Sequence, residues 1–154
     1  ELLSGRGIEV KIHSVITRSN LRILGPQLRE IGQDLARRRA IPAKWKFYQY
    51  MSYDDPLRDI THAVTEDEFA AFQTEARKAL DESGIELHFK DNREMHESLF
   101  NILAYGNAQY MRAGDTWKSS RRTRDLRSYA NIDELLAAHD IRKDLFQKFH
   151  SFTR

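Results

Sequence analysis

Two alternating, β-prone segments separated by a segment of helical length constrain the fold of this chain most. Residues 8–17, IEVKIHSVIT, alternate in polarity, and residues 44–51, KWKFYQYM, are rich in aromatic side chains, so both are predicted strands. Residues 21–39 are predicted to form a helix with Pro26 in its first turn. The apolar positions at helical spacing are Leu24, Leu28, Ile31 and Leu35. A connection of this length joins parallel strands through a right-handed crossover, so the sequence predicts a βαβ unit.

A second helix and strand extend the parallel pattern. Thr65, with Glu68 three residues later, is a capping-box pattern that predicts a helix over residues 65–83, and Gly84 is placed to end it. Residues 85–90 alternate in polarity and are predicted to form a third strand. Because an exposed apolar edge strand is unfavourable, we expect earlier strands or a partner chain to cover the first strand.

The rest of the chain is predicted to hold a hairpin and short helices. Residues 98–104 and 108–111 flank a Tyr-Gly-Asn turn and are predicted to pair as a hairpin that turns on Gly106. One or two short helices are expected from residue 132 onward, and residues 52–63 are predicted to be a loop. The expected fold class is therefore α/β, with parallel βα units followed by a hairpin and short helices.

The absence of cysteine from all 154 residues excludes disulfides and thiolate-ligated metal sites within this chain. The histidines show no metal-ligand spacing, so no metal site is predicted. The chain has no apolar run approaching the ~20 residues that a membrane-spanning helix needs and no leader-like segment. These features predict a cytoplasmic protein without a membrane partner.

The net charge of +2 gives no argument for nucleic-acid binding, although basic residues gather in two places. One cluster is Arg37, Arg38 and Arg39, and the other is Lys118, Arg121, Arg122, Arg124 and Arg127. Each cluster is either solvated or in contact with phosphates. We favour solvation because no pattern of stacking aromatic residues accompanies the arginines, and nucleic acid is not an expected partner.

Cationic side chains alternate along the first two predicted strands. Lys11 and His13 share one face of the first strand, and Lys44, Lys46 and Tyr48 share one face of the second. If both faces line an interior, three lysines and a histidine converge there, and buried lysines need anions. Such a cluster would suit a phosphate-bearing substrate. The alternative is a solvated, outward-facing surface, which periodicity alone favours.

Several segments carry a resemblance that covers nearly the whole chain, in order and with matching gaps. They are residues 10–20, 44–49, 64–69, 95–105 and 135–146. The first, VKIHSVITRSN, and the second, KWKFYQ, resemble the last two barrel strands of radical S-adenosylmethionine enzymes, and more specifically of the viperin-like family. The others resemble that family's acidic segment, its Met-x-x-Ser stretch and its terminal helices.

The resemblance implies that the chain is the C-terminal part of a (β/α)6 barrel, beginning at the fifth strand. In such enzymes an N-terminal Cys-x3-Cys-x2-Cys segment ligates a [4Fe–4S] cluster, and the cluster binds and cleaves S-adenosylmethionine. The present sequence has no counterpart of that segment and, without cysteine, ligates no cluster by itself. The cluster-binding half is therefore expected in cis or on a partner chain.

By the same resemblance, Lys11, Lys44 and Lys46 fall on positions that hold a substrate triphosphate. Asn20 and Gln49 fall on positions near the cofactor or the floor of the barrel, so both are predicted to bind cofactor. No residue is assigned a catalytic role.

Three positions depart from the family pattern. His13 stands in place of an asparagine, and Leu99 in place of a tyrosine associated with hydrogen transfer. Lys44 replaces an arginine and so lacks a bidentate fork. These departures indicate a different substrate or another branch of the superfamily, and His13 is included among the predicted substrate-binding residues.

The predicted function is the substrate side of a viperin-like radical S-adenosylmethionine enzyme that acts on a nucleoside triphosphate or another anionic small molecule. Residues 1–63 would hold the last two strands and the helix of the barrel, and residues 64–154 a C-terminal extension packed on the same domain. Two alternatives are a stand-alone anion- or nucleotide-binding module and a protein-interaction module that docks through its sheet edge. Neither alternative is catalytic.

Overall fold

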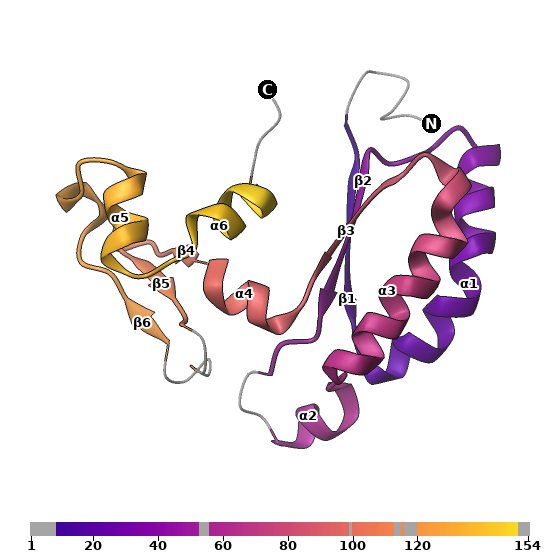
Figure 1. Cartoon of the computed structure of the whole chain (residues 1–154), viewed down its shortest axis with the longest axis horizontal. Helices are drawn as coiled ribbons and strands as arrows, with labels where there is room; N and C mark the ends of the chain where they lie inside the picture. The colour runs from indigo at the N-terminus through magenta and orange to yellow at the C-terminus, as the bar shows by residue number, and fades with distance from the viewer. Residues whose placement is uncertain (1–8, 53–55, 99, 113–114, 116–119, 151–154) are drawn as a thin grey trace. The chain divides into compact units, whose positions relative to one another are not determined.

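The computed structural model describes residues 9–52, 56–98, 100–112, 115 and 120–150. Within these, residues 9–51 and 56–91 form one compact unit, and the remaining residues form a second. The division expected after residue 63 differs from this one, because the helix and the strand that follow residue 63 belong to the first unit. The elements of each unit can be followed in Figure 1.

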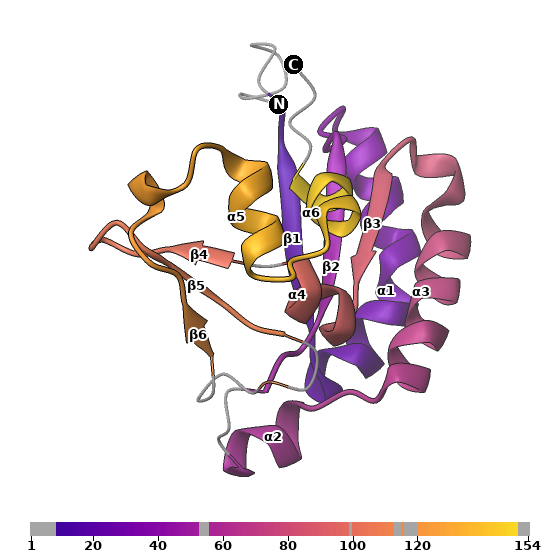
Figure 2. The ribbon, with the colours of Figure 1, turned by 60° about the vertical axis from the view of Figure 1, so that its left-hand side comes forward.

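The first unit is built on a parallel sheet of three strands. They are β1 (Lys11–Ile16), β2 (Lys44–Gln49) and β3 (Glu86–Lys90), in the order β1-β2-β3. Figure 2 shows the strands side by side in this order. All three predicted strands are confirmed, and so is the parallel pairing of the first two. The fold is therefore α/β, and the three described strands form an open sheet rather than a closed barrel.

Helix α1 (Arg18–Arg37) connects β1 to β2 and begins earlier than expected. Thr17 is the N-cap: its backbone N–H donates to Asn20 Oδ1 at 2.8 Å, and its hydroxyl accepts from the Asn20 N–H at 3.3 Å. This reciprocal capping uses asparagine where glutamate or glutamine is usual. Pro26 consequently lies inside the helix, and its predicted position in the first turn was wrong.

Helix α3 (Glu66–Leu80) connects β2 to β3 and has the predicted capping box. The Thr65 hydroxyl accepts from the Glu68 N–H at 3.1 Å, and Glu68 Oε2 accepts from the Thr65 N–H at 2.8 Å. A short 3-10 turn, η2 (Asp81–Ser83), follows α3. Gly84 then ends the helical segment at φ +73°, a left-handed conformation that glycine adopts without steric cost.

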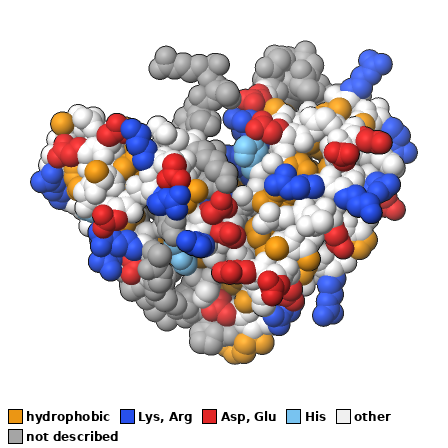
Figure 3. Space-filling view, in the orientation of Figure 1, with side chains coloured by type: hydrophobic (Ala, Val, Ile, Leu, Met, Phe, Trp, Pro, Cys, Tyr) orange, Lys and Arg blue, Asp and Glu red, His pale blue; other side chains and the backbone are white. Residues whose placement is uncertain are grey.

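Helix α2 (Pro56–His62) occupies a segment that was predicted to be a loop, so this prediction was wrong. With seven residues the helix is about two turns long, too short for an apolar periodicity to stand out in the sequence. Its side chains Leu57 and Ile60 are exposed, and hydrophobic atoms appear at the lower edge of the molecule in Figure 3.

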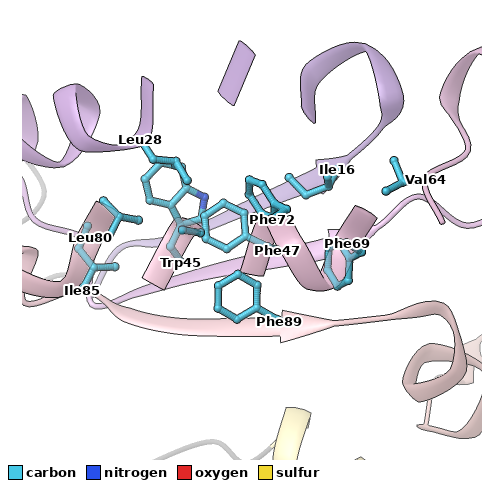
Figure 4. Close-up of a cluster of buried hydrophobic side chains, with 11 residues drawn as sticks. Ile16, Leu28, Trp45, Phe47, Val64, Phe69, Phe72, Leu80, Ile85 and Phe89 are labelled. Atoms are coloured by element: carbon cyan, nitrogen blue, oxygen red, sulfur yellow. The ribbon is translucent and has the colours of Figure 1, made fainter. Parts of the chain in front are cut away.

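The core of the first unit lies between the sheet and the pair α1 and α3, which cover the same face (Figure 1). The chain moves from β1 to β2 and from β2 to β3 in the same direction across the sheet. Two right-handed crossovers in the same direction place both helices on one side of it. Figure 4 shows Phe47 at the centre of this core, near Phe72 and Phe89. The ring centroid of Phe47 lies 5.3 Å from that of Phe72 and 5.3 Å from that of Phe89. The indole N–H of Trp45 donates to Ser14 Oγ at 3.0 Å, which satisfies a polar group in the apolar layer.

The second unit contains a small antiparallel sheet. Strands β4 (Phe100–Ile102) and β5 (Ala108–Tyr110) form the predicted hairpin, with Gly106 at φ +80° in its turn. A third strand, β6 (Arg121–Arg122), pairs with β5 and was not predicted. A strand of two residues is too short to show a recognisable alternation. Both residues are arginines, and they were interpreted as part of a solvated basic cluster.

The described residues of the second unit also include four short helical segments. They are α4 (Asn92–Ser98), η3 (Leu126–Ser128), α5 (Ile132–Ala138) and α6 (Lys143–His150). The last two are the short helices expected from residue 132 onward. Asn131 caps α5, since its side chain accepts from the Glu134 N–H at 2.9 Å.

His139, at the end of α5, bridges two tyrosine hydroxyls in the second unit. Its Nδ1 lies 2.9 Å from Tyr110 Oη, and its Nε2 lies 2.6 Å from Tyr129 Oη. A neutral imidazole can accept one of these bonds and donate the other. Burial lowers the pKa of His139, and the nearby cations Arg112 and Arg124 lower it further, against an opposing effect of Asp140.

We expect His139 to make the second unit less stable in mild acid. Its pKa is lower in the folded chain than the ordinary value of 6.5, so the unfolded chain binds more protons as the pH falls through 6.5. The contribution of the neutral ring is therefore complete above this pH and decreases below it. Substitution His139→Gln should cost about 1–3 kcal/mol at pH 7.5, for two hydrogen bonds of about 0.5–1.5 kcal/mol each.

Urea unfolding of the wild type and of His139→Gln at pH 7.5 and pH 5.5 measures this effect. The variant should lose less stability than the wild type between the two pH values, because it lacks the imidazole. Equal losses in both proteins would contradict a role for His139 in the acid response.

Candidate anion-binding site

The face of the parallel sheet opposite α1 and α3 carries three rows of side chains, one residue from each strand, and all but Val15 are polar. The rows are Lys11–Lys44–Glu86, His13–Lys46–His88 and Val15–Tyr48–Lys90. We call these nine residues the polar face. Neighbouring strands lie about 4.8 Å apart, so side chains in one row are within contact range of each other.

The four predicted substrate-binding residues all lie on the polar face, in its first two rows. Lys11 and Lys44 are adjacent in the first row, and His13 and Lys46 are adjacent in the second. The lysines differ in exposure: the side chain of Lys11 is 37% exposed and that of Lys44 is 15% exposed. The alternation in the sequence predicted the shared face within each strand, and the parallel register of β1 and β2 brings the two pairs onto one side of the sheet. Their role in binding stays a prediction.

Glu86 is an acidic residue of the polar face and links both cationic rows. Its carboxylate lies 3.2 Å from Lys44 Nζ and 2.6 Å from His88 Nε2. The hydrogen bonds from His88 and then from Lys44 lower the pKa of Glu86. Lys11 has a separate partner, Glu9, at 3.4 Å.

Positively charged side chains outnumber carboxylates on the polar face. This excess of positive charge contributes to lowered pKa values at its central residues, Lys46 and His13. The pKa of Lys46 is lowered by burial and by the nearby Lys44 and Lys11, with a smaller opposing effect of Glu86. The pKa of His13 is lowered by burial and by Lys46 and Lys11. An anion bound beside these groups would offset their mutual repulsion, so the charge pattern favours an anionic ligand.

The third strand supplies polar-face residues that sequence reasoning missed. Glu86, His88 and Lys90 alternate along β3, and Lys90 is only 4% exposed. The alternation of these polar residues was visible in the predicted strand of residues 85–90. Assigning them to the same face as Lys44 and Lys46 requires the pairing of β3 with β2 and its register, which the sequence did not give.

The two predicted cofactor-binding residues lie away from the lysines. The Asn20 side chain caps α1 and also donates to the Val15 carbonyl at 2.7 Å. Gln49 is buried on the opposite face of β2, where its Nε2 donates to the Val64 carbonyl at 2.8 Å. Both side chains have structural hydrogen bonds, and their cofactor-binding role stays a prediction.

The arginines of the two basic clusters are largely neutralised by nearby carboxylates. The ion pairs are Arg37 and Arg38 with Asp34, Arg121 with Asp115, Arg124 with Glu134 and Arg127 with Asp125. Hydrogen bonds from Arg127 lower the pKa of Asp125 to about 2. This pairing agrees with solvated, structural roles. Lys118, like Leu99, lies outside the described residues.

A cavity of 240 Å³ lies on the other side of the sheet, where α1 meets the end of α3 and η2. Its lining mixes the cations Arg29 and Lys78 with the acids Asp81 and Glu82. Charges of both signs are also interspersed over this helical layer in Figure 3. The mixture gives no preference for a ligand of either charge.

The described residues hold neither a candidate metal site nor a candidate membrane span. No three His, Asp or Glu side chains there are grouped so that they could hold a metal ion. No described helix has the length and hydrophobicity needed to cross a membrane.

The chain was also compared with known proteins. Comparisons with protein-family models, with curated proteins and with solved structures give no significant match. The candidate site therefore rests on the geometry and charge of the polar face.

Proposed function

We propose that this chain forms the substrate side of a viperin-like radical S-adenosylmethionine enzyme and binds the phosphate groups of a nucleotide on its polar face. The observation that carries the proposal is the convergence of Lys11, Lys44 and Lys46 in two adjacent rows of that face. Two rows are two residues apart along each strand, or about 6.6 Å, a distance that a chain of phosphate groups can span.

The arrangement of the first unit supports the barrel part of this proposal. Three parallel strands with both connecting helices on one face match consecutive βα units of a barrel, in which the helices lie outside and the opposite face lines the interior. The lysines would then point inward, where an anionic group would be partly shielded from water. Tyr48, near the carboxyl ends of the strands, would face the remainder of the substrate.

The residues of this chain do not fit an iron–sulfur cluster. Cluster ligation requires thiolates, and none of the 154 residues is a cysteine. The cluster and most contacts to S-adenosylmethionine would have to come from the other half of the enzyme. The part proposed for this chain is to bind and orient the anionic substrate.

Binding of inorganic tripolyphosphate to the purified, folded chain tests the anion-binding part of the proposal. We expect a Kd between about 10 µM and 1 mM, corresponding to about −7 to −4 kcal/mol, with weaker binding at high salt. Isothermal titration calorimetry at low and high salt measures it, and circular dichroism verifies that the chain is folded. Absence of binding at low salt by the folded chain would contradict the proposal.

The lysine-rich face alone would also suit a stand-alone anion-binding module without catalysis. The two functions differ in the source of cysteines. For the radical enzyme, a Cys-x3-Cys-x2-Cys segment must be encoded upstream of Glu1 in the same reading frame or on a partner chain. If neither encodes it while tripolyphosphate binds, the stand-alone module is correct and the radical enzyme is not.

A further inference from the structure

Lys46 occupies the centre of the polar face. It lies on the middle strand and in the middle row, with His13 beside it on β1 and His88 beside it on β3. Lys44 precedes it by two residues on the same face, and Lys11 is the neighbour of Lys44 in the first row. The Lys46 side chain is thus partly buried, and the charged groups that act on it are Lys44, Lys11 and the carboxylate of Glu86.

This environment makes the uncharged form of the Lys46 amine more accessible than it is for an exposed lysine. Burial, Lys44 and Lys11 lower its pKa, in that order of effect. An uncharged lysine amine beside other cations is the usual nucleophile for carbonyl compounds in proteins. The neighbouring first row supplies the complementary feature, because Lys11 and Lys44 can hold an anionic group about 6.6 Å from the second row.

We propose that Lys46 forms an imine with an aldehyde or ketone that carries a phosphate group, while Lys11 and Lys44 hold the phosphate. The inference rests on the proposed anion-binding function of the polar face and adds a covalent site to it. No cofactor or metal is required for this step.

The reaction balances as a condensation. The nitrogen lone pair of Lys46 adds to the carbonyl carbon, the carbonyl oxygen takes up a proton, and a proton leaves the nitrogen. The hydroxyl group then takes up the second nitrogen proton and leaves as water while the carbon–nitrogen double bond forms. The imidazole of His13, adjacent in the same row, is available to accept the nitrogen proton, because its lowered pKa keeps it uncharged at neutral pH.

Pyridoxal 5′-phosphate is a suitable probe, because it carries both an aldehyde and a phosphate. The folded chain is incubated with a limiting amount at pH 7.5, the imine is reduced with borohydride, and the modified lysines are located by peptide mass spectrometry. We expect Lys46 to be modified about tenfold faster than Lys78 or Lys143, a preference that needs only about 1.4 kcal/mol. Lys78 and Lys143 serve as exposed reference lysines.

Three further measurements separate a specific site from general lysine labelling. Pyridoxal without the phosphate should lose the preference for Lys46, and excess tripolyphosphate should protect Lys46 but not Lys78. The variant Lys46→Arg retains a long basic side chain but cannot form an imine, so the fast-labelled site should disappear and only the slow labelling of the reference lysines should remain.

The outcomes distinguish failure of this inference from failure of the proposed function. Equal labelling of Lys46, Lys78 and Lys143, or preferential labelling of Lys11 or Lys44, would overturn the inference. An unchanged preference with pyridoxal would overturn the role of the phosphate. Tripolyphosphate binding without a Lys46 adduct overturns the inference alone, whereas absence of both also overturns the anion-binding function.

Discussion

Replacing Lys44 and Lys46 together by alanine is expected to weaken tripolyphosphate binding by about 100-fold. Hydrogen bonds to charged groups contribute about 1.5–3 kcal/mol each, and a 100-fold loss corresponds to about 2.7 kcal/mol, so the prediction allows for screening by solvent. Lys44 is 15% exposed, which makes its charge less screened than that of a surface lysine. Titration calorimetry of the double variant at low salt measures the loss.

The control for this prediction is Lys78→Ala, which removes one exposed lysine from α3, outside the polar face. Its affinity should stay within about twofold of the wild type, since a distant exposed charge is screened. Glu86→Gln provides the opposite test: removing the carboxylate beside Lys44 should strengthen binding. An equal loss in Lys78→Ala and in the double variant would mean that net charge, and not the polar face, determines binding.

Replacing Phe47 by alanine is expected to destabilise the first unit by about 3–5 kcal/mol. Phe47 is fully buried at the centre of the middle strand, and its ring packs against Trp45, Phe72 and Phe89 at centroid distances of 5.0, 5.3 and 5.3 Å. The substitution would leave a cavity bounded by the sheet and α3 (Figure 4). Since domains are stable by about 5–15 kcal/mol, this loss could unfold the unit at moderate temperature.

Urea unfolding followed by tryptophan fluorescence measures this loss, because Trp45 lies in the same core. Leu57→Ala is the matched control: Leu57 is 80% exposed on α2, so its truncation should change stability by less than about 0.5 kcal/mol. If Phe47→Ala and Leu57→Ala had similar effects, the core described for the first unit would be wrong.

The parallel sheet could be predicted because each of its strands has one face in the core. Trp45 and Phe47 alternate with Lys44 and Lys46, and this period of two identifies both the strand and its faces. Helix ends were predictable where the cap follows the common pattern, as at Thr65, and not where asparagine replaces the acidic residue, as at Thr17. The short elements α2 and β6 have too few residues to show the helical period of 3.6 or the strand period of two.

Several residues of the candidate site could be predicted from the sequence, but the contacts between its side chains could not. Alternation placed Lys11 and Lys44 on definite faces of their own strands. The contacts of Lys44 and His88 with Glu86 depend on the register between β2 and β3, which are separated in the sequence by helices α2 and α3. The common side of α1 and α3, which defines the polar face as the one opposite, follows from two crossovers of the same hand.

Chemical-shift mapping by two-dimensional ¹H–¹⁵N NMR tests most directly whether the polar face is the anion site. Tripolyphosphate is titrated into the labelled chain, and the shifts of assigned backbone amides are followed. The largest shifts are predicted in β1 and β2, around Lys11, His13, Lys44 and Lys46. Shifts concentrated instead around the arginines of residues 121–127, or spread evenly over exposed basic residues, would contradict an anion site on the polar face.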